Sequence, residues 1–416
     1  MLVKTILNKV YSFSGFVYSK IRFNQSEREE IVVTVEATGR SKGTCSVCSK
    51  TCPGYDRLPL RRFDFIPIWN FSVIFEYHPR RVSCSDHGIV VEKLPWCNGK
   101  HPTTIGYQKF LAQWARILSW QEVARRFKTT WDTVYTSIRS VVDYGLAHRK
   151  LDGIDSIGID EMAIGKGHDY ITAVYQIDFD KHRLLWLGKD RTETTLLSFF
   201  EMFGEERSKL LKNVCTDMWQ AYLNVIKQKA AQALNILDRF HIMKKFNEAI
   251  DTVRRTEVAT LKQKGQEPIL TKKRWILLKK PQNLTTKQRG HLRTLLRCNL
   301  VSVRAYLLRE DFQHFWTYIS STWAGKFLDE WIRRTMLSKI EPMKKVARML
   351  RSHRSLIMNW FKVHEVCSSG VVEAMNNTAK LTIRKSYGFR QFETLECALY
   401  HKLGDLPLPK LTHEFF

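Results

Sequence analysis

Hydrophobic and polar residues alternate most clearly between residues 153 and 178, GIDSIGIDEMAIGKGHDYITAVYQID. The apolar members of the two runs are Ile154, Ile157 and Ile159, followed by Ile171, Ala173, Tyr175 and Ile177. A period of two is typical of β-strands with one buried face. The link between the runs contains Gly165-Lys166-Gly167, so the pattern predicts a β-hairpin.

Strand-like and helix-like segments alternate after this hairpin. The expected strands are 182–188, 213–217 and 234–238, and the expected helices are 192–203, 218–229 and 239–255. The resulting order, βββαβαβα, is that of an RNase H-like domain. In that fold the first and fourth strands are neighbours at the centre of the sheet. Asp160, which ends the first strand, and Asp217, which ends the fourth, are therefore expected side by side.

Two neighbouring carboxylates favour a bound cation. Like-charge repulsion between Asp160 and Asp217 costs free energy unless a positive ion relieves it. A divalent ion that bridges them is the natural solution, and hard oxygen ligands favour magnesium or manganese. Glu161 has the opposite alternation, so we expect it beside the site and not among the ligands.

A third carboxylate follows a long interruption. Residues 256–366 are basic, aromatic and helical in pattern, and their tryptophans are expected mainly in a core. The next segment predicts a helix with polar residues at i, i+4, i+7 and i+11 on one face: Glu373, Asn377, Lys380 and Arg384. The plainer interpretation is a solvated polar stripe. After Asp160 and Asp217, we favour Glu373 as a further metal ligand, with the two basic residues holding phosphates.

Residues 104–145 are helical in pattern and contain a helix-turn-helix signature at 120–139. Ala124 would allow the two helices to cross closely, and Val134 and Ile138 would face inward. Lys128 occupies the turn, where glycine is usual. Thr130 is the expected N-cap of the second helix. The residues expected to contact DNA are Thr130, Trp131, Thr133, Thr136 and Arg139.

Two metal-binding pairs precede this region: Cys45 with Cys48, and Cys84 with His87. Each pair can reach one edge of a tetrahedron, so the four residues together predict a structural zinc site. Strand-like runs between the pairs indicate a zinc-ribbon-like β module. The alternatives are unpaired structural cysteines, or a ligand set in which Cys52 or Cys97 replaces one member.

The charge balance points to a polyanionic partner. The 416 residues contain 67 Lys+Arg against 41 Asp+Glu, a net charge of +26. Nucleic acid is the simplest partner for such an excess, and the alternatives are a solvated basic surface or attachment to a membrane surface. Charges interrupt every apolar run before the roughly 20 residues of a membrane span. Lys4 and Lys9 break any signal-peptide core, and the cysteine usage fits a reducing cytoplasm.

Four runs carry a family resemblance: GIDEMAIGKGHDY, TDMWQAY, DRFHIMKKFNEAIDTVRR and SGVVEAMNNTAKLTIRKSYGFR. They resemble insertion-sequence DDE transposases of the ISL-three family, and the CxxC…CxxHG with a following helix-turn-helix is similar to that family's layout. The resemblance implies Asp160, Asp217 and Glu373 as a catalytic triad that holds two Mg²⁺ or Mn²⁺ ions. Asp238 and His241 match a family motif, and we expect both, with Asn377, beside the metal ligands.

The resemblance also implies partners and a location. These are double-stranded DNA, as terminal inverted repeats and as target, and a second copy of the chain in a homodimer on DNA. The expected location is the bacterial cytoplasm, at the nucleoid, with no membrane association. Two other functions stay open. One is a catalytically silent DNA-binding regulator or capture protein on a transposase scaffold, and the other is a structure-selective nuclease or resolvase.

The expected fold is multidomain α/β: an RNase H-like catalytic core with an all-helical insertion, preceded by a zinc-ribbon-like module and a helix-turn-helix domain. The expected boundaries are an N-terminal segment at 1–40, a zinc-binding β module at 41–100, the helix-turn-helix domain at 101–150, the core at 151–255 and 367–405, the insertion at 256–366 and a tail at 406–416.

Overall fold

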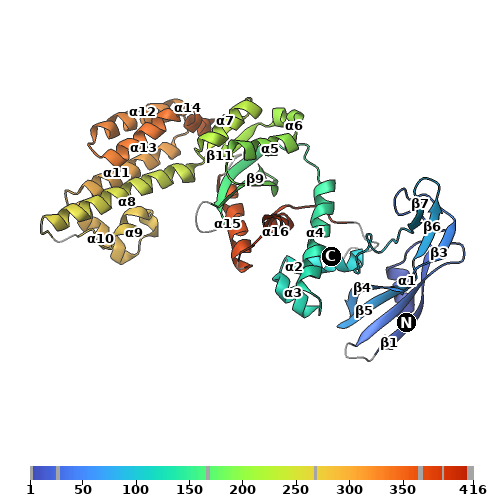
Figure 1. The fold of residues 1–416 in the computed structure, drawn as a ribbon. Helices are drawn as coiled ribbons and strands as arrows, with labels where there is room; N and C mark the ends of the chain where they lie inside the picture. The colour runs from blue at the N-terminus through green and yellow to red at the C-terminus, as the bar shows by residue number, and fades with distance from the viewer. Residues whose placement is uncertain are drawn as a thin grey trace. The chain divides into compact units, whose positions relative to one another are not determined.

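The computed structural model describes residues 3–24, 29–164, 169–266, 269–363, 369–386 and 388–409. It contains two compact units, one built from residues 1–150 with 381–416 and the other from residues 151–380 (Figure 1). The link Gly165-Lys166-Gly167 of the expected hairpin lies outside the described residues.

A five-stranded sheet forms the centre of the second unit. Its strands are β8 (Ser156–Ala163), β9 (Tyr170–Asp178), β10 (Lys181–Lys189), β11 (Asn213–Thr216) and β12 (Leu234–Leu237). The order is β10-β9-β8-β11-β12, with β8, β11 and β12 parallel and the other pairs antiparallel. The first and fourth strands of this unit are thus neighbours, as predicted.

Strand β8 pairs with its two neighbours over different lengths. It pairs with β11 only as far as Gly158, opposite Cys215, but with β9 as far as Ala163. The sequence predicted that Asp160 ends its strand, and this is wrong, because β8 continues to Ala163. Asp160 lies inside β8, two residues beyond the last pair with β11, where the sheet opens on that side.

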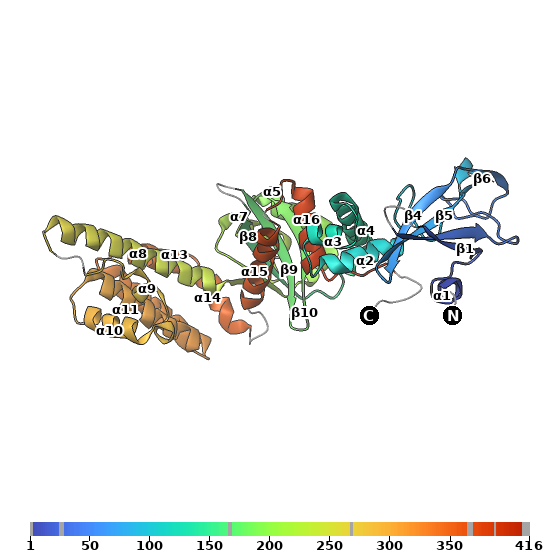
Figure 2. The same ribbon diagram turned by 90° about the horizontal axis from the view of Figure 1, so that it is seen from below.

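Helices cover both faces of this sheet. Apolar side chains from α5 (Glu193–Phe203) and α7 (Gln220–Lys229) pack with Ile157 and Ile159 on one face. The short helix α6 (Glu205–Leu210) connects α5 to β11 in the sequence. Helix α15 (Ser369–Lys385) lies against the other face (Figure 2). There Val372 approaches Gly158 so closely that a Cβ at position 158 would collide with it. Alternation along β8 places Asp160 on the same face as Gly158.

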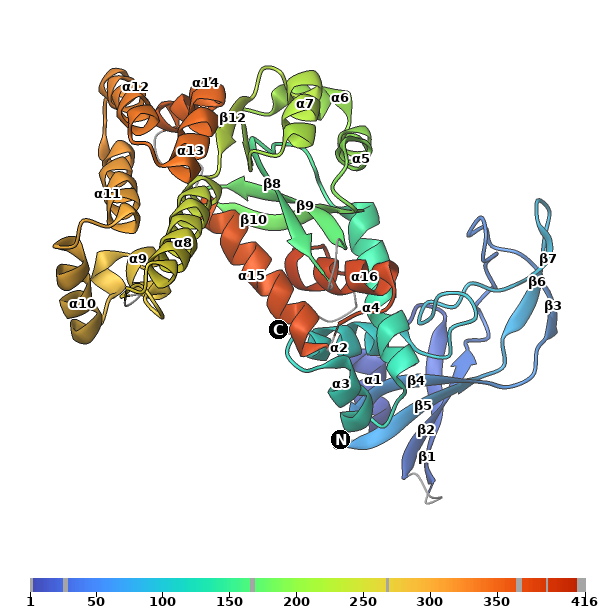
Figure 3. The same cartoon turned by 60° about the vertical axis from the view of Figure 1, so that its left-hand side comes forward.

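The helical insertion begins inside α8. The elements after α8 (Arg239–Gln263) are α9 (Arg274–Leu278), η1 (Pro281–Asn283), α10 (Thr286–Leu296), α11 (Val301–Gln313), η2 (His314–Thr317), α12 (Ser321–Leu337), α13 (Glu341–Ser352), α14 (Arg354–Met358) and η3 (Asn359–Lys362) (Figure 3). The ring of Phe246 in α8 packs in a tilted arrangement against Phe312 and Trp331 in their common core. The core thus extends well before the expected boundary at residue 256.

Most tryptophans of the insertion are structural. Trp331 is fully buried and donates to the Leu308 carbonyl over 2.9 Å, and Trp316 is buried beside Trp360. Trp323 is different, since it is 61% exposed with the Lys326 ammonium over its ring. The expectation of a core role is therefore wrong for Trp323 and also for Trp275, which is 58% exposed.

The other unit starts with a four-stranded sheet in the order β1-β2-β5-β4, preceded by α1 (Val3–Val10). Its strands are β1 (Phe16–Asn24), β2 (Glu30–Ala37), β4 (Arg61–Ile68) and β5 (Phe71–Tyr77). Strand β2 pairs in parallel with β5, so this sheet crosses the expected boundary at residue 40. Residues 1–40 are not a separate segment.

A second, three-stranded sheet follows, with β6 (Arg80–Cys84) between β3 (Gly54–Arg57) and β7 (Gly88–Val91). A buried ion pair anchors it, because the Arg80 guanidinium donates to the Glu92 carboxylate over 2.7 Å and the Tyr77 hydroxyl donates to that carboxylate over 2.7 Å. Its hairpin β6–β7 carries the second metal-binding pair.

Helices α2 (Ile105–Ala115), α3 (Trp120–Arg126) and α4 (Trp131–His148) follow. Ala124, Val134 and Ile138 are buried, as predicted, and the Thr130 side chain caps α4 by accepting from the Thr133 amide. Lys128 adopts a left-handed conformation in the turn, with φ of 51°. The sequence therefore departs from glycine at a position whose backbone favours glycine.

The last helix, α16 (Phe392–Leu403), packs on α4. Residues from 381 onward thus belong to the compact unit of the helix-turn-helix, whereas the sequence predicted a second part of the catalytic core at 367–405. Apolar α16 residues such as Leu395 and Leu399 are buried in this packing.

Candidate active site and metal centres

Asp160 and Asp217 come from the two adjacent parallel strands β8 and β11, with Asp217 directly after β11. Their side chains are only 14% and 15% exposed. The Glu161 amide donates to Asp160 Oδ1 over 2.8 Å, and the Trp219 amide donates to Asp217 Oδ1 over 2.9 Å. Each carboxylate is therefore held by the backbone that follows it.

His241 lies between these two aspartates. Its Nε2 is 4.0 Å from Asp160 Oδ1, and its Nδ1 is 3.8 Å from Asp217 Oδ2. Asp238 directs the first turn of α8 by accepting from the Phe240 amide over 2.7 Å. The DRFH run thus places a helix N-cap and an imidazole at the edge of the carboxylate pair.

The electrostatics of the two aspartates favour a bound cation. Burial raises the pKa of Asp160 to about 6, an effect opposed by His241 and reinforced by the negative charges of Asp217 and Asp238. Burial likewise raises the pKa of Asp217. A bound cation would stabilise the charged form of both carboxylates, and their oxygen donors suit Mg²⁺ or Mn²⁺.

Asn376 is the site residue that sequence reasoning missed. Its side-chain Nδ2 donates to Asp160 Oδ2, its Oδ1 accepts from the Tyr175 hydroxyl over 2.7 Å, and it is 3% exposed. The expected residue, Asn377, is exposed. The buried face of α15 is marked by Val372 and Ala379, at i and i+7, and Asn376 lies at i+4 between them. That apolar frame is the signal that could have identified it.

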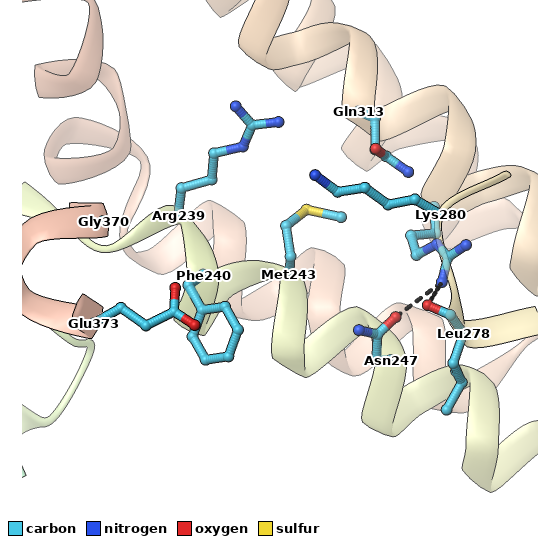
Figure 4. Close-up of a pocket in the computed structure, with 10 residues that line it drawn as sticks. Arg239, Phe240, Met243, Asn247, Leu278, Lys280, Gln313, Gly370 and Glu373 are labelled. Atoms are coloured by element: carbon cyan, nitrogen blue, oxygen red, sulfur yellow. Dashed lines mark hydrogen bonds between the residues drawn. The ribbon is translucent and has the colours of Figure 1, made fainter. Parts of the chain in front are cut away.

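Glu373 lies on α15 three residues before Asn376 and is exposed. It lines a cavity of about 280 Å³ together with Arg239, Phe240 and Lys280. In Figure 4 its carboxylate lies beside the Phe240 ring. His241 thus lies within 4.0 Å of both Asp160 and Asp217, whereas Glu373 lines a cavity beside the first turn of α8 whose lining includes neither aspartate.

The same cavity carries positive charge. Burial lowers the pKa of Arg239, whose guanidinium lies 5.1 Å from the centroid of the Trp316 ring. The Lys280 side chain extends toward Met243 (Figure 4). On α15, Lys380 is exposed in the unit of residues 151–380, whereas Arg384 is exposed in the part of the helix that belongs to the other unit.

Glu161 follows Asp160 on β8 and by strand alternation points to the opposite face of the sheet, although its negative charge still acts on Asp217. Its carboxylate accepts two hydrogen bonds from the Arg191 guanidinium, at 2.9 and 3.0 Å. Arg191 lies over the rings of Tyr170 and Trp219, at 4.0 and 4.8 Å from their centroids. Since the Trp219 amide holds Asp217, this contact connects the loop after β11 to β8.

The predicted zinc ligands come together in the other unit. One ligand atom from each of Cys45, Cys48, Cys84 and His87 lies within 4.8 Å of all the others. Cys84 Sγ is 3.7 Å from Cys48 Sγ and 3.6 Å from His87 Nδ1. Bonds of about 2.3 Å to a tetrahedral zinc give edges of about 3.8 Å. A disulfide needs about 2.05 Å, so the spacing is that of a metal site.

The acidity of two of the three ligand thiols agrees with this set, because the pKa of Cys45 and that of Cys84 are lowered, whereas neighbouring Cys45 and Cys84 help to raise the pKa of Cys48. The backbone amides of Asp86 and His87 lower the pKa of Cys84 to about 7. Burial raises the pKa of Cys52 and, to about 11, that of Cys97. Zinc binds thiolates, so the two spare cysteines are the poorer ligands, and neither belongs to the cluster.

The residues expected to contact DNA occupy the start of α4. The Thr133 hydroxyl lies 2.9 Å from that of Thr130, and the Thr136 hydroxyl donates to the Asp132 carbonyl over 2.8 Å. Trp131 is 38% exposed and stacks on Tyr135. Arg139 donates to the Tyr135 hydroxyl over 3.0 Å. Thr130, Trp131, Thr136 and Arg139 are exposed, and Thr133 is partly buried.

Comparison with known proteins agrees with the resemblance noted in the sequence. A family model described as "Transposase", for DDE transposases of the ISL3 type, matches residues 157–399. The chain is 26% identical over 396 residues to the transposase for insertion sequence element IS1001 of Bordetella parapertussis, covering 94% of this chain and 96% of the relative. It is 26% identical over 377 residues to the transposase for insertion sequence element IS1557 of Mycobacterium tuberculosis, with 84% and 83% covered. Within the described part of the chain, every helix is too short or too polar to span a membrane.

Proposed function

The chain belongs to the ISL3 family of DDE transposases, which are DNA-processing enzymes, and we propose that it cuts DNA at the ends of an insertion sequence and joins the 3′ ends to target DNA. The observation that carries this proposal is the buried pair Asp160 and Asp217 on adjacent strands. The strand order around the pair supports an RNase H-like core with a helical insertion.

The proposed ligands of two Mg²⁺ or Mn²⁺ ions are Asp160, Asp217 and Glu373. Bound divalent ions supply activation of the attacking hydroxyl and stabilisation of the leaving oxygen. The protein's contribution is to orient the carboxylates: Asn376 and the Glu161 amide hold Asp160, and the Trp219 amide holds Asp217. Asp238 contributes as the N-cap that positions the first turn of α8.

DNA phosphates would be held by basic side chains near the third carboxylate. Arg239 and Lys280 line the cavity that contains Glu373, which places two cations beside a proposed metal ligand. Lys380 and Arg384 are exposed on α15 and would contact phosphates farther along the strand.

Recognition of the terminal inverted repeats is proposed for the other unit. Cys45, Cys48, Cys84 and His87 would hold a structural zinc, and the start of α4, with Thr130, Trp131, Thr133, Thr136 and Arg139, would enter the major groove. Pairing of two ends calls for a homodimer on DNA. The proposed location is the bacterial cytoplasm, at the nucleoid.

The test compares Asp160→Asn with Asp152→Asn in full-length protein. Asp152 is an exposed aspartate paired with Arg207, so it serves as a control for loss of one carboxylate. We expect Asp160→Asn to bind end DNA normally and to lose strand cleavage in Mg²⁺, and Asp152→Asn to retain both. Cleavage by Asp160→Asn at the wild-type rate would overturn the assignment. End binding without cleavage by the wild-type protein would favour the regulator instead.

A further inference from the structure

We propose that His241 is itself a protein ligand of a divalent ion in this site, through Nδ1 and together with Asp217, so that the ion has a nitrogen donor as well as carboxylate oxygens. The inference rests on the proposed function, since it concerns the same site. It gives the imidazole of the DRFH run a direct contact with the ion, where the sequence suggested only a supporting position.

The distances across the imidazole fall between the two spacings expected for a pair of ligands on one ion. Nδ1 is 3.8 Å from Asp217 Oδ2 and Nε2 is 4.0 Å from Asp160 Oδ1. Both exceed the length of a hydrogen bond. Metal–ligand bonds of about 2.1 Å place two ligands of one octahedral ion about 3.0 Å apart when adjacent and about 4.2 Å apart when opposite. A single ion can therefore contact His241 and an aspartate with little rearrangement.

The pairing of atoms favours Nδ1 and Asp217 Oδ2. Both oxygens of Asp160 already accept hydrogen bonds, from the Glu161 amide and from Asn376. Asp217 Oδ1 accepts from the Trp219 amide, so its orientation leaves Oδ2 directed at the imidazole. The Asp217 carboxylate is thus held in a position from which one oxygen remains for an ion.

The backbone around His241 limits its freedom to leave this position. Asp238 caps the first turn of α8, and the next residue, Ile242, is fully buried. The imidazole itself is only 21% exposed. A histidine held at this place contributes a ligand without a large loss of conformational freedom on binding.

A nitrogen donor changes which ions the site prefers. Imidazole is a softer ligand than carboxylate and favours later transition metals, whereas oxygen-only sites suit Mg²⁺. We therefore expect the site to bind Mn²⁺ and Co²⁺ more tightly than Mg²⁺, and the difference to shrink when His241 is replaced by a residue without an imidazole.

The experiment is Mn²⁺ binding to the full-length, zinc-loaded protein, followed by pulsed electron paramagnetic resonance, which detects directly coordinated ¹⁴N. The variants are His241→Gln and, as a control, His182→Gln, an exposed histidine of β10. Zinc loading keeps Mn²⁺ from His87, because thiolate sites favour zinc. Circular dichroism melting establishes that both variants fold.

We expect a nitrogen coupling in the wild type and in His182→Gln, and its loss in His241→Gln with Mn²⁺ affinity about 10- to 100-fold weaker. Bound Mn²⁺ without nitrogen coupling in the wild type, or a coupling that survives in His241→Gln, would overturn the inference. Strand cleavage in Mg²⁺ is measured on the same samples. Cleavage without nitrogen coupling would contradict only the role of His241 as a ligand. Absence of both Mn²⁺ binding and cleavage would contradict the proposed function as well.

Discussion

The side-chain amide of Asn376 donates a hydrogen bond to the carboxylate of Asp160, although the two residues lie 216 positions apart in the sequence. The carbonyl end of the same amide accepts from the hydroxyl of Tyr175 over 2.7 Å. The hydroxyl selects one orientation of the amide, so the NH₂ group is directed at Asp160. The carboxylate is thereby oriented from α15 as well as from its own strand.

Replacement of this amide should impair the site. We expect Asn376→Ala to lower metal affinity and the rate of strand cleavage about 10- to 100-fold, as for other groups that orient metal ligands. The variant should also lose about 1–3 kcal/mol of stability, because it leaves the Tyr175 hydroxyl buried without its acceptor. Asn377→Ala, at the exposed neighbour, is the matched control. Equal losses in the two variants would contradict the role of Asn376.

The cysteine cluster makes a prediction about metal content. We expect one zinc per chain by elemental analysis. The zinc should be lost in Cys84→Ser and retained in Cys52→Ser, because Cys84 belongs to the four-residue cluster and Cys52 does not. Chelation should destabilise the surrounding β-strands, since binding energy at a structural site is also folding energy. Zinc retained in Cys84→Ser, or lost equally in both variants, would refute this ligand set.

The cations of the Glu373 cavity predict a salt-dependent effect. We expect Arg239→Ala and Lys280→Ala each to weaken binding to all duplex sequences and to reduce the slope of log affinity against log salt concentration by about 1, as loss of one phosphate contact does. Lys229→Ala, on the exposed end of α7, serves as the control. Affinity titrations between low and moderate salt give the slopes. If both variants keep the wild-type slope of log affinity against log salt concentration, Arg239 and Lys280 do not contact DNA phosphates.

His401 predicts a pH dependence of stability in the unit that contains α2, α4 and α16. Burial, with a smaller contribution from Arg116, lowers the pKa of His401 from 6.5 to about 3. Between pH 6.5 and pH 3 the His401 imidazole is therefore mostly protonated in the unfolded chain and mostly neutral in the folded chain. The contribution of this group is fully present above pH 6.5 and is lost as pH falls toward 3, by up to about 1.4 kcal/mol per pH unit.

Denaturant titrations at pH 7 and pH 5 measure this effect. His401→Gln should reduce the difference in unfolding free energy between the two pH values, and His148→Gln, at an exposed histidine, should leave it unchanged. A His401→Gln variant with the same acid sensitivity as the wild type would contradict the expectation.

Features that depend on local spacing could be predicted from the sequence. The CxxC and CxxH pairs each place two candidate metal ligands close together in the chain, and Thr130 caps α4 through a contact three residues away. The strand order that brings Asp160 beside Asp217 follows from the sequence of elements, because few topologies accommodate it.

Features that depend on distant pairing could not be predicted in this way. The parallel pairing of β2 with β5 joins segments about 40 residues apart, and nothing in the pattern of either strand identifies its partner. The packing of α16 on α4 is of the same kind. Asn376 was missed because an asparagine on an amphipathic helix reads as polar surface, until the apolar residues on either side show which face is buried.

The position of α15 in the chain has a consequence for biosynthesis. A ribosome that has reached residue 360 has already produced Asp160, Asp217 and His241, but not the helix that covers Gly158 and carries Glu373 and Asn376. Under the proposed function, a nascent or prematurely terminated chain thus lacks the groups that complete the centre. Under the same proposal, translation of α15 is the step that would complete the centre, so shorter products would lack strand-cleavage activity.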